Sequence, residues 1–174
     1  VDYFLRFYRE RGDKFQTLYE LEDHSALQEL ADEYQKLTSI MSEGHERITD
    51  KRPENLLFMG LIKKILPQAR FIYTRRNLLD NGVSVYFQQL NDLSKFSTTL
   101  ESFVDYDEQC QKLMSHWRSI FGDSIYEISY EGLVSDPRKY ARELISFLQL
   151  DWEPGCLDLE SRKNFVRTAS VSQV

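Results

Sequence analysis

The stretch that decides the fold is FIYTRRNLLDNGVSVY, residues 71–86. Its apolar start predicts a buried strand, and Asn77 followed by Asp80 predicts the start of a helix. Arg76 ends the strand region, and Ser84 follows eight residues later in the helix. A guanidinium offers a fork of donors, and the start of a helix offers free N–H groups and the positive end of its dipole. The stretch therefore predicts a site that holds a phosphate.

Helices and short strands alternate on both sides of this stretch. Apolar periodicity, capping residues and prolines predict helices over about residues 1–11, 25–43, 53–66, 77–90, 100–121 and 136–148. Short strands are predicted at residues 47–51, 70–74 and 124–129. This alternation is typical of a parallel α/β sheet with helices on both of its faces. No internal domain boundary is visible, so residues 1–174 are expected to form a single domain.

Three candidate site residues follow the predicted strands. Lys51, Arg76 and Tyr130 each lie at or just past a strand end. Parallel α/β sheets bind ligands at the carboxyl ends of their strands, near a switch point in the strand order. We therefore expect these three residues on the same edge of the sheet.

Composition and charge argue against several classes of function. The chain of 174 residues carries a net charge of −6, which disfavours a broad nucleic-acid surface but not a single small anionic ligand. Cys110 and Cys156 give no disulfide framework, and the three histidines do not cluster, so no metal is predicted. The sequence has no apolar run of about 18 residues and no signal peptide, so we expect no membrane segment and a cytoplasmic location.

Six segments, taken in order, resemble the sulfotransferases that use 3′-phosphoadenosine-5′-phosphosulfate (PAPS). The branch that looks most similar includes the tetratricopeptide-linked bacterial sulfotransferases and the tyrosylprotein sulfotransferases. The resemblance runs from about residue 25 to residue 174 and implies a three-layer, P-loop-like fold with a parallel sheet flanked by helices. The matching segments are DKRPEN (50–55), FIYTRRN (71–77), VSVYF (83–87), LMSHW (113–117), YEGLVSDP (130–137) and TASVSQV (168–174).

The resemblance implies a role for each candidate residue. Arg76 and Ser84 match the pair that binds the 3′-phosphate of the co-substrate, and Tyr130 matches a tyrosine near the adenine. Lys51 matches a catalytic lysine beside the oxygen that bridges sulfonate and 5′-phosphate, where an ammonium neutralises the departing charge. Ser170 matches a serine near the phosphosulfate. His116 and Trp117 also match the pattern, and we interpret both as structural residues.

The chain departs from the family pattern in two places. The family has a loop with Gly and Ser/Thr after its first strand, which wraps the 5′-phosphosulfate, and no such loop occurs here. We therefore expect a partial domain that lacks the first strand and this loop, and a chain truncated at both ends. Cytosolic small-molecule members have a histidine two residues after the matching lysine, where this chain has Pro53. The tyrosylprotein branch uses a glutamate from an upstream segment instead, and that segment has no match here, so no general base is predicted.

The leading interpretation is an enzyme that moves a sulfonate from PAPS to a hydroxyl or amine by in-line displacement and releases adenosine 3′,5′-bisphosphate without a metal. The acceptor class stays open between a small molecule, a glycan, a lipid and a peptide, and the oligomeric state is not predicted. A different interpretation is a catalytically inactive α/β module that binds a nucleotide or a partner. A P-loop kinase shares the architecture, but the G-x-x-x-x-G-K-[ST] motif is missing from the sequence.

Overall fold

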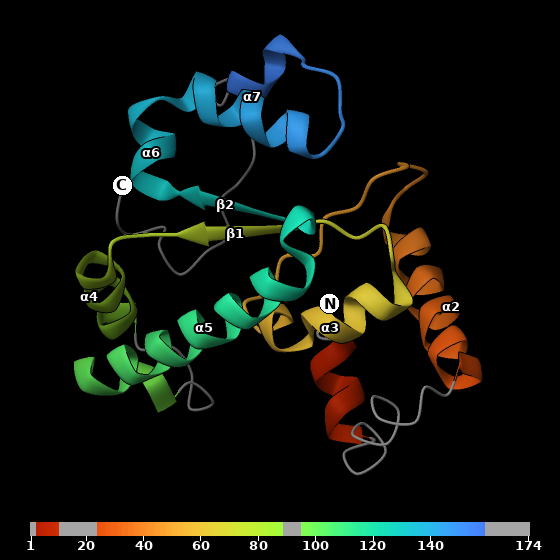
Figure 1. The fold of residues 1–174 in the computed structure, drawn as a ribbon, viewed down its shortest axis with the longest axis horizontal. Coiled ribbons are helices and arrows are strands. Elements are labelled where there is room, and N and C mark those ends of the chain that lie inside the picture. The colour runs from red at the N-terminus through yellow and green to blue at the C-terminus, as the bar shows by residue number, and fades with distance from the viewer. Residues whose placement is uncertain (1–2, 11–23, 89–94, 159–174) are drawn as a thin grey trace. The chain divides into compact units, whose positions relative to one another are not determined.

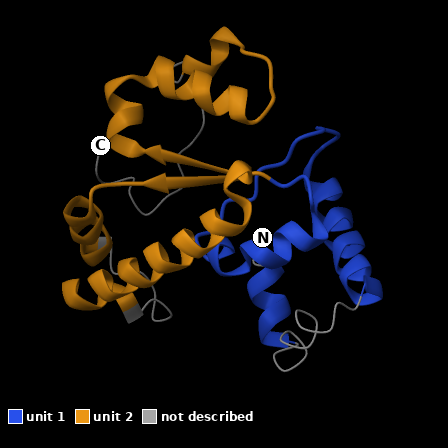
Figure 2. Ribbon diagram, viewed as in Figure 1, with its two compact units in different colours: residues 1–69 blue, residues 70–174 orange. Residues whose placement is uncertain are grey.

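The computed structural model describes residues 3–10, 24–88 and 95–158. The chain divides into two compact units, residues 1–69 and residues 70–174, which are coloured separately in Figure 2. The expectation of a single domain stays a prediction.

Unit 1 is helical and has an aromatic core. It contains a helix over residues 3–10, helix α2 (His24–Met41) and helix α3 (Asn55–Ile65) (Figure 1). The rings of Phe4 and Tyr34 lie 5.0 Å apart, and those of Phe4 and Phe58 lie 6.1 Å apart, so all three helices meet at one aromatic cluster. The buried apolar side chains of this unit are Tyr3, Phe4, Phe7, Leu30, Ala31, Tyr34, Phe58, Met59, Leu61, Ile62 and Ile65.

The helices of unit 1 end where the sequence predicts that they should. After α2 the chain turns at Gly44, whose φ of +88° is a conformation that glycine adopts without strain. Helix α3 ends at Ile65, two residues before Pro67, because proline disfavours helical geometry in the residue before it.

The strand predicted at residues 47–51 was wrong. These residues form a segment without regular secondary structure. The side chains of Ile48 and Lys51 are exposed, and no residue of the segment is fully buried. The segment therefore lacks the buried face that would hold a strand in a sheet. Lys51 therefore lies on a loop and not at the end of a strand.

Unit 2 contains a parallel pair of strands with helices on both faces. Strand β1 (Phe71–Arg75) pairs with strand β2 (Ile125–Ser129), in a register that runs from Phe71 opposite Ile125 to Arg75 opposite Ser129. Helix α5 (Leu100–Phe121) contacts one face, where the rings of Phe71 and Phe121 lie 6.0 Å apart. Helix α7 (Pro137–Phe147) contacts the other face, where the rings of Tyr126 and Phe147 lie 5.4 Å apart (Figure 1). The parallel α/β character is confirmed, and the wider three-layer sheet stays a prediction.

Local capping explains where the helices of unit 2 begin. The side chain of Thr99 accepts a hydrogen bond from the Ser102 amide at 3.1 Å and starts α5. Asp136 accepts one from the Lys139 amide at 3.1 Å and starts α7. Helix α4 (Leu78–Gln88) and the short helix α6 (Tyr130–Ser135) follow β1 and β2 directly. The sequence does not predict α6. Single 3-10 turns occur at Lys95–Ser97, Gly122–Ser124 and Pro154–Leu157.

The close contact between α6 and α7 depends on a glycine. A Cβ atom added at Gly132 would lie 2.5 Å from both the Cζ and the Oη atoms of Tyr140. Alanine in place of glycine normally stabilises a helix by up to ~1 kcal/mol. Here we expect Gly132→Ala to destabilise the protein by about 1–3 kcal/mol, because the phenol ring must move. Urea denaturation measures this change.

The control for this prediction is the same substitution in a Tyr140→Ala background. There the clashing ring is gone, so Gly132→Ala should become neutral or stabilising. A stabilising effect of Gly132→Ala with Tyr140 still present would contradict the packing described here.

Candidate functional site

Two of the predicted site residues meet at the carboxyl edge of the strand pair. Arg75 of β1 and Ser129 of β2 form the last pair of the strand register. Arg76 and Tyr130 are the next residues after this pair. The guanidinium carbon of Arg76 lies 5.1 Å from the centre of the Tyr130 ring, within the range of a cation–π contact. Arg76 is exposed, and 49% of Tyr130 is exposed, so both can reach a ligand. Arg76 and Tyr130 therefore lie at the same edge, as predicted.

The neighbouring arginine has a different task. The Nη1 atom of Arg75 donates to the Oε1 atom of Glu127 at 2.9 Å, and Arg118 of α5 donates to the other carboxylate oxygen. Burial alone would raise the pKa of Glu127, but the hydrogen bonds and charges of the two arginines outweigh it, and this pKa is lowered. Arg75 is thus engaged in an ion pair that joins β1, β2 and α5. The two adjacent arginines therefore differ in their contacts: Arg75 pairs with Glu127, and Arg76 lies over the Tyr130 ring.

The start of α4 differs from the sequence-based expectation. The Oδ1 atom of Asn77 accepts hydrogen bonds from the amides of Leu79, at 2.9 Å, and Asp80, at 3.2 Å. The predicted cap is confirmed, but these N–H groups are consequently not free for a phosphate. The expectation of open amides at the helix start was wrong for these two groups, because the Asn77 cap satisfies them. These two amides are therefore engaged within the helix start itself.

Glu131 is a residue of this edge that the sequence does not single out. Its Oε1 atom accepts a hydrogen bond from the Asn77 amide at 2.7 Å, and its Oε2 atom accepts one from the Ser129 hydroxyl at 2.8 Å. The pKa of Glu131 is lowered, first by the hydrogen bond from the Asn77 amide and also by that from Ser129 and by the charge of Arg76. The only signal in the sequence is an acidic residue in the first turn after a strand.

Ser84 lies on α4, one of the helices next to this edge. A Cβ at Gly82 would lie 3.0 Å from the Phe103 ring, so that side of α4 packs on α5. Successive residues of a helix are about 100° apart, which places Ser84 on roughly the opposite side, and on the same side as Asn77 about two turns earlier. The Ser84 side chain is partly buried.

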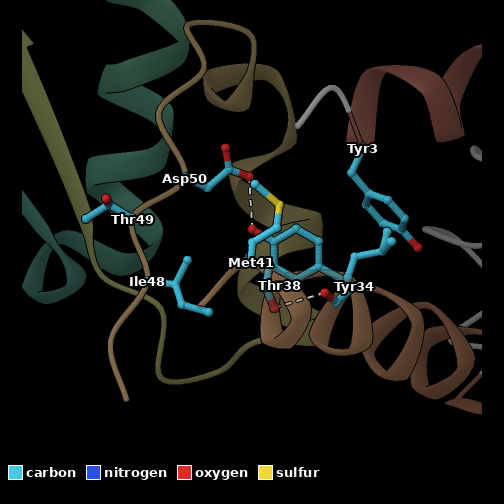
Figure 3. Close-up of a pocket in the computed structure, with 8 residues that line it drawn as sticks. Tyr3, Tyr34, Thr38, Met41, Ile48, Thr49 and Asp50 are labelled. Carbon is cyan, nitrogen blue, oxygen red and sulfur yellow. Dashed lines mark hydrogen bonds between the residues drawn. The ribbon is translucent and has the colours of Figure 1, made fainter. Parts of the chain in front are cut away.

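Lys51 belongs to unit 1, where a hydrogen bond anchors the residue before it. The Tyr34 hydroxyl, on α2, donates to the Oδ2 atom of Asp50 at 2.9 Å (Figure 3). Burial, followed by this hydrogen bond and the charge of Asp50, raises the pKa of Tyr34. On the other side, the Asn55 amide donates to the carbonyl of Arg52 at 3.1 Å and forms the turn into α3. The residues directly before and after the exposed Lys51 are therefore both held by hydrogen bonds, Asp50 through its side chain and Arg52 through its backbone carbonyl.

A cavity of about 40 Å³ lies beside the Tyr34–Asp50 hydrogen bond, lined by Tyr3, one face of α2 and residues 48–50 (Figure 3). A cavity of this size holds little more than a few water molecules. It is too small for an acceptor substrate.

The remaining predicted residues divide into two groups. Ser170 lies outside the described residues, so its role stays a prediction. Trp117 is 7% exposed and stacks on Phe121 with ring centres 5.3 Å apart, which confirms that it is a core residue. His116 is exposed and contacts the Trp117 ring.

Within the described ranges, no group of three or more His, Cys, Asp or Glu side chains could hold a metal ion. Cys110 and Cys156 are free thiols. None of the helices in the part of the chain that the structure describes is both long and apolar enough to cross a membrane.

Parallel α/β sheets bind ligands at the carboxyl ends of their strands, which is where Arg76 and Tyr130 lie in this chain. The chain belongs to the sulfotransferase family, whose model matches residues 8–154. It is also similar to an uncharacterized protein of Aquifex aeolicus (strain VF5), with 34% identity over 155 residues, which are 87% of this chain and 20% of that protein. The chain thus spans about a fifth of the length of this curated relative. No solved structure gives a significant match.

Proposed function

We propose that the protein transfers a sulfonate group from PAPS to a hydroxyl or amine of an acceptor and releases adenosine 3′,5′-bisphosphate. The observation that carries this proposal, together with family membership, is the Arg76 guanidinium over the Tyr130 ring at the aligned ends of β1 and β2. This arrangement offers a positive charge for a phosphate next to an exposed aromatic ring for a base. Both groups are what the 3′-phosphate and adenine of the co-substrate require.

The side chains present fit this co-substrate. Arg76 would bind the 3′-phosphate through its fork of donors, with the Ser84 hydroxyl as a second donor from α4. Tyr130 would stack on the adenine with the part of its ring that is exposed. Because the Asn77 cap occupies amides at the start of α4, the guanidinium supplies most of the attraction in this proposal.

Lys51 and Ser170 would act at the reacting end of the co-substrate. PAPS supplies the sulfonate, whose sulfur forms a bond to the acceptor oxygen or nitrogen while the bond to the bridging phosphate oxygen breaks. The Lys51 ammonium would stabilise the negative charge that this oxygen gains. The acceptor loses a proton to a group that we do not name, because no described residue is placed beside an acceptor. No metal is needed for this charge balance.

Four features of the proposal rest on the sequence. The acceptor is a small molecule, a glycan, a lipid or a peptide, and the branch of tetratricopeptide-linked and tyrosylprotein sulfotransferases stays the proposed branch. A cytoplasmic location is part of the proposal, and so is the absence of nucleic acid as a partner, which rests on the net charge of −6.

A thermal-shift titration with adenosine 3′,5′-bisphosphate tests the proposal. A ligand that binds only the folded state stabilises it by about 2.7 kcal/mol at a hundredfold excess over Kd. We expect a rise in Tm with the bisphosphate and a much smaller rise with AMP, which lacks the 3′-phosphate. Arg76→Ala should abolish the difference between the two nucleotides.

The matched control is Arg138→Ala, which removes an exposed arginine from the first turn of α7. This variant should respond to the bisphosphate like the wild type. If neither the wild type nor Arg138→Ala distinguishes the bisphosphate from AMP, the 3′-phosphate site is wrong, and an inactive binding module becomes the better interpretation.

A further inference from the structure

The carboxylate of Glu131 joins the chain segments that leave β1 and β2. It accepts a hydrogen bond of 2.7 Å from the amide of Asn77, the residue after Arg76. It accepts a second hydrogen bond of 2.8 Å from the hydroxyl of Ser129, the residue before Tyr130. The first of these hydrogen bonds spans 54 positions of the sequence. Glu131 thus connects the neighbours of both residues that the proposed nucleotide site needs.

This connection lies where the strand pairing has ended. The last pair in the register is Arg75 opposite Ser129, so the ladder itself does not hold Arg76 against Tyr130. A cation–π contact between exposed groups is weak and sets no fixed geometry. The two Glu131 hydrogen bonds involve an ionised acceptor and are stronger. The bond from the Asn77 amide crosses between the two segments beyond the ladder, and the bond from Ser129, two residues before Glu131 on the same segment, orients the carboxylate that accepts it.

The charge of Glu131 excludes a direct role as a ligand for phosphate. A carboxylate beside Arg76 attracts the same guanidinium that a phosphate would need, and it repels the phosphate itself. The benefit of Glu131 to an anion site must therefore come from geometry, and it must exceed this electrostatic cost. A glutamine would keep an oxygen for the Asn77 amide and an NH₂ group for the Ser129 hydroxyl, without the charge.

We propose that Glu131 is a positioning residue for the nucleotide site, which fixes Arg76 and Tyr130 through hydrogen bonds to Asn77 and Ser129. This inference rests on the proposed function. Under this inference, Arg76 and Tyr130 bind the nucleotide together only when the side chain of residue 131 links the two segments that leave the strands.

Calorimetric titration with adenosine 3′,5′-bisphosphate on Glu131→Ala and Glu131→Gln tests this inference. Glu131→Ala should raise the Kd about tenfold, because the donors lose their fixed geometry. Glu131→Gln should bind as tightly as the wild type or more tightly, because it keeps the bridge and removes the repulsion. Hydrogen exchange at the Asn77 amide should accelerate in the alanine variant and stay slow in the glutamine variant.

The control is Glu143→Ala. It removes a carboxylate of α7 that accepts a hydrogen bond of 3.1 Å from the Tyr126 hydroxyl and that lies away from the carboxyl ends of the strands. It should lower stability without changing the Kd. A lower Tm with an unchanged Kd in Glu131→Ala would overturn the positioning role, and so would an equal loss of affinity in the glutamine variant. If the wild type does not bind the bisphosphate at all, the proposed function fails and this inference fails with it. A Kd that depends on Arg76 but not on Glu131 overturns the inference alone.

Discussion

Trp117→Ala should cost about 3–5 kcal/mol of unfolding free energy, which is a large part of the stability of a domain. The Trp117 side chain is 7% exposed and stacks on Phe121 with ring centres 5.3 Å apart and planes 17° apart. Phe121 in turn contacts Phe71 of β1 at 6.0 Å. Removing the indole therefore leaves a cavity within the contact that fixes α5 against the strand pair.

The matched control lies on the same helix. Ile120→Ala removes an apolar side chain from a residue that is 56% exposed, so the expected loss stays below about 1 kcal/mol. Urea denaturation compares the variants, and Trp117→Phe serves if the alanine variant does not fold, with an expected loss between the two. Equal losses for Trp117→Ala and Ile120→Ala would show that Trp117 is not part of the core.

Local sequence signals predicted much of the fold. Asn77 and Asp136 stand at the predicted helix starts because their side chains satisfy amides within three residues, a relation that the sequence displays directly. Short apolar runs likewise predicted β1 and β2. The segment at residues 47–51 misled because one Ile and one Thr between charged residues resemble a strand, whereas a strand also needs a partner and a buried face. Helix α6 escaped prediction because it has only six residues and contains Gly132.

The candidate site shows the same division between local and distant relations. The positions of Arg76 and Tyr130 follow from the ends of two strands, so the sequence predicted that they would share an edge. The role of Glu131 depends on a hydrogen bond to Asn77, and no periodicity or spacing in the sequence links these two residues. The different contacts of Arg75 and Arg76 depend equally on Glu127, which lies on the neighbouring strand. Sequence patterns thus located the strand ends where Arg76 and Tyr130 lie, and only tertiary contacts distinguish the neighbouring residues at that edge.

Replacing Lys51 has the largest effect that we expect on activity. Lys51→Ala should lower kcat about 10²–10³-fold, the usual loss when one fixed group that stabilises developing charge is removed. The KM for PAPS should change much less, because in the proposed reaction the ammonium acts mainly on charge that appears in the transition state. Stability should be unaffected, since the Lys51 side chain is exposed and Asp50 keeps its hydrogen bond to Tyr34. The assay follows adenosine 3′,5′-bisphosphate release with a panel of alcohols, phenols and amines.

Two further variants show whether charge at this position is what matters. Lys36→Ala removes an exposed lysine of α2 in the same unit and should leave kcat unchanged. Lys51→Arg keeps a positive charge but spreads it over a planar group, so it should recover only part of the rate. A kcat for Lys51→Ala within about threefold of the wild type would exclude Lys51 from leaving-group stabilisation, since a threefold change is less than 1 kcal/mol of barrier. If Lys51→Ala lowers the Tm so far that unfolding accounts for the lost activity, Lys51 instead stabilises unit 1. A group that acts only on the transition state has no reason to lower the Tm.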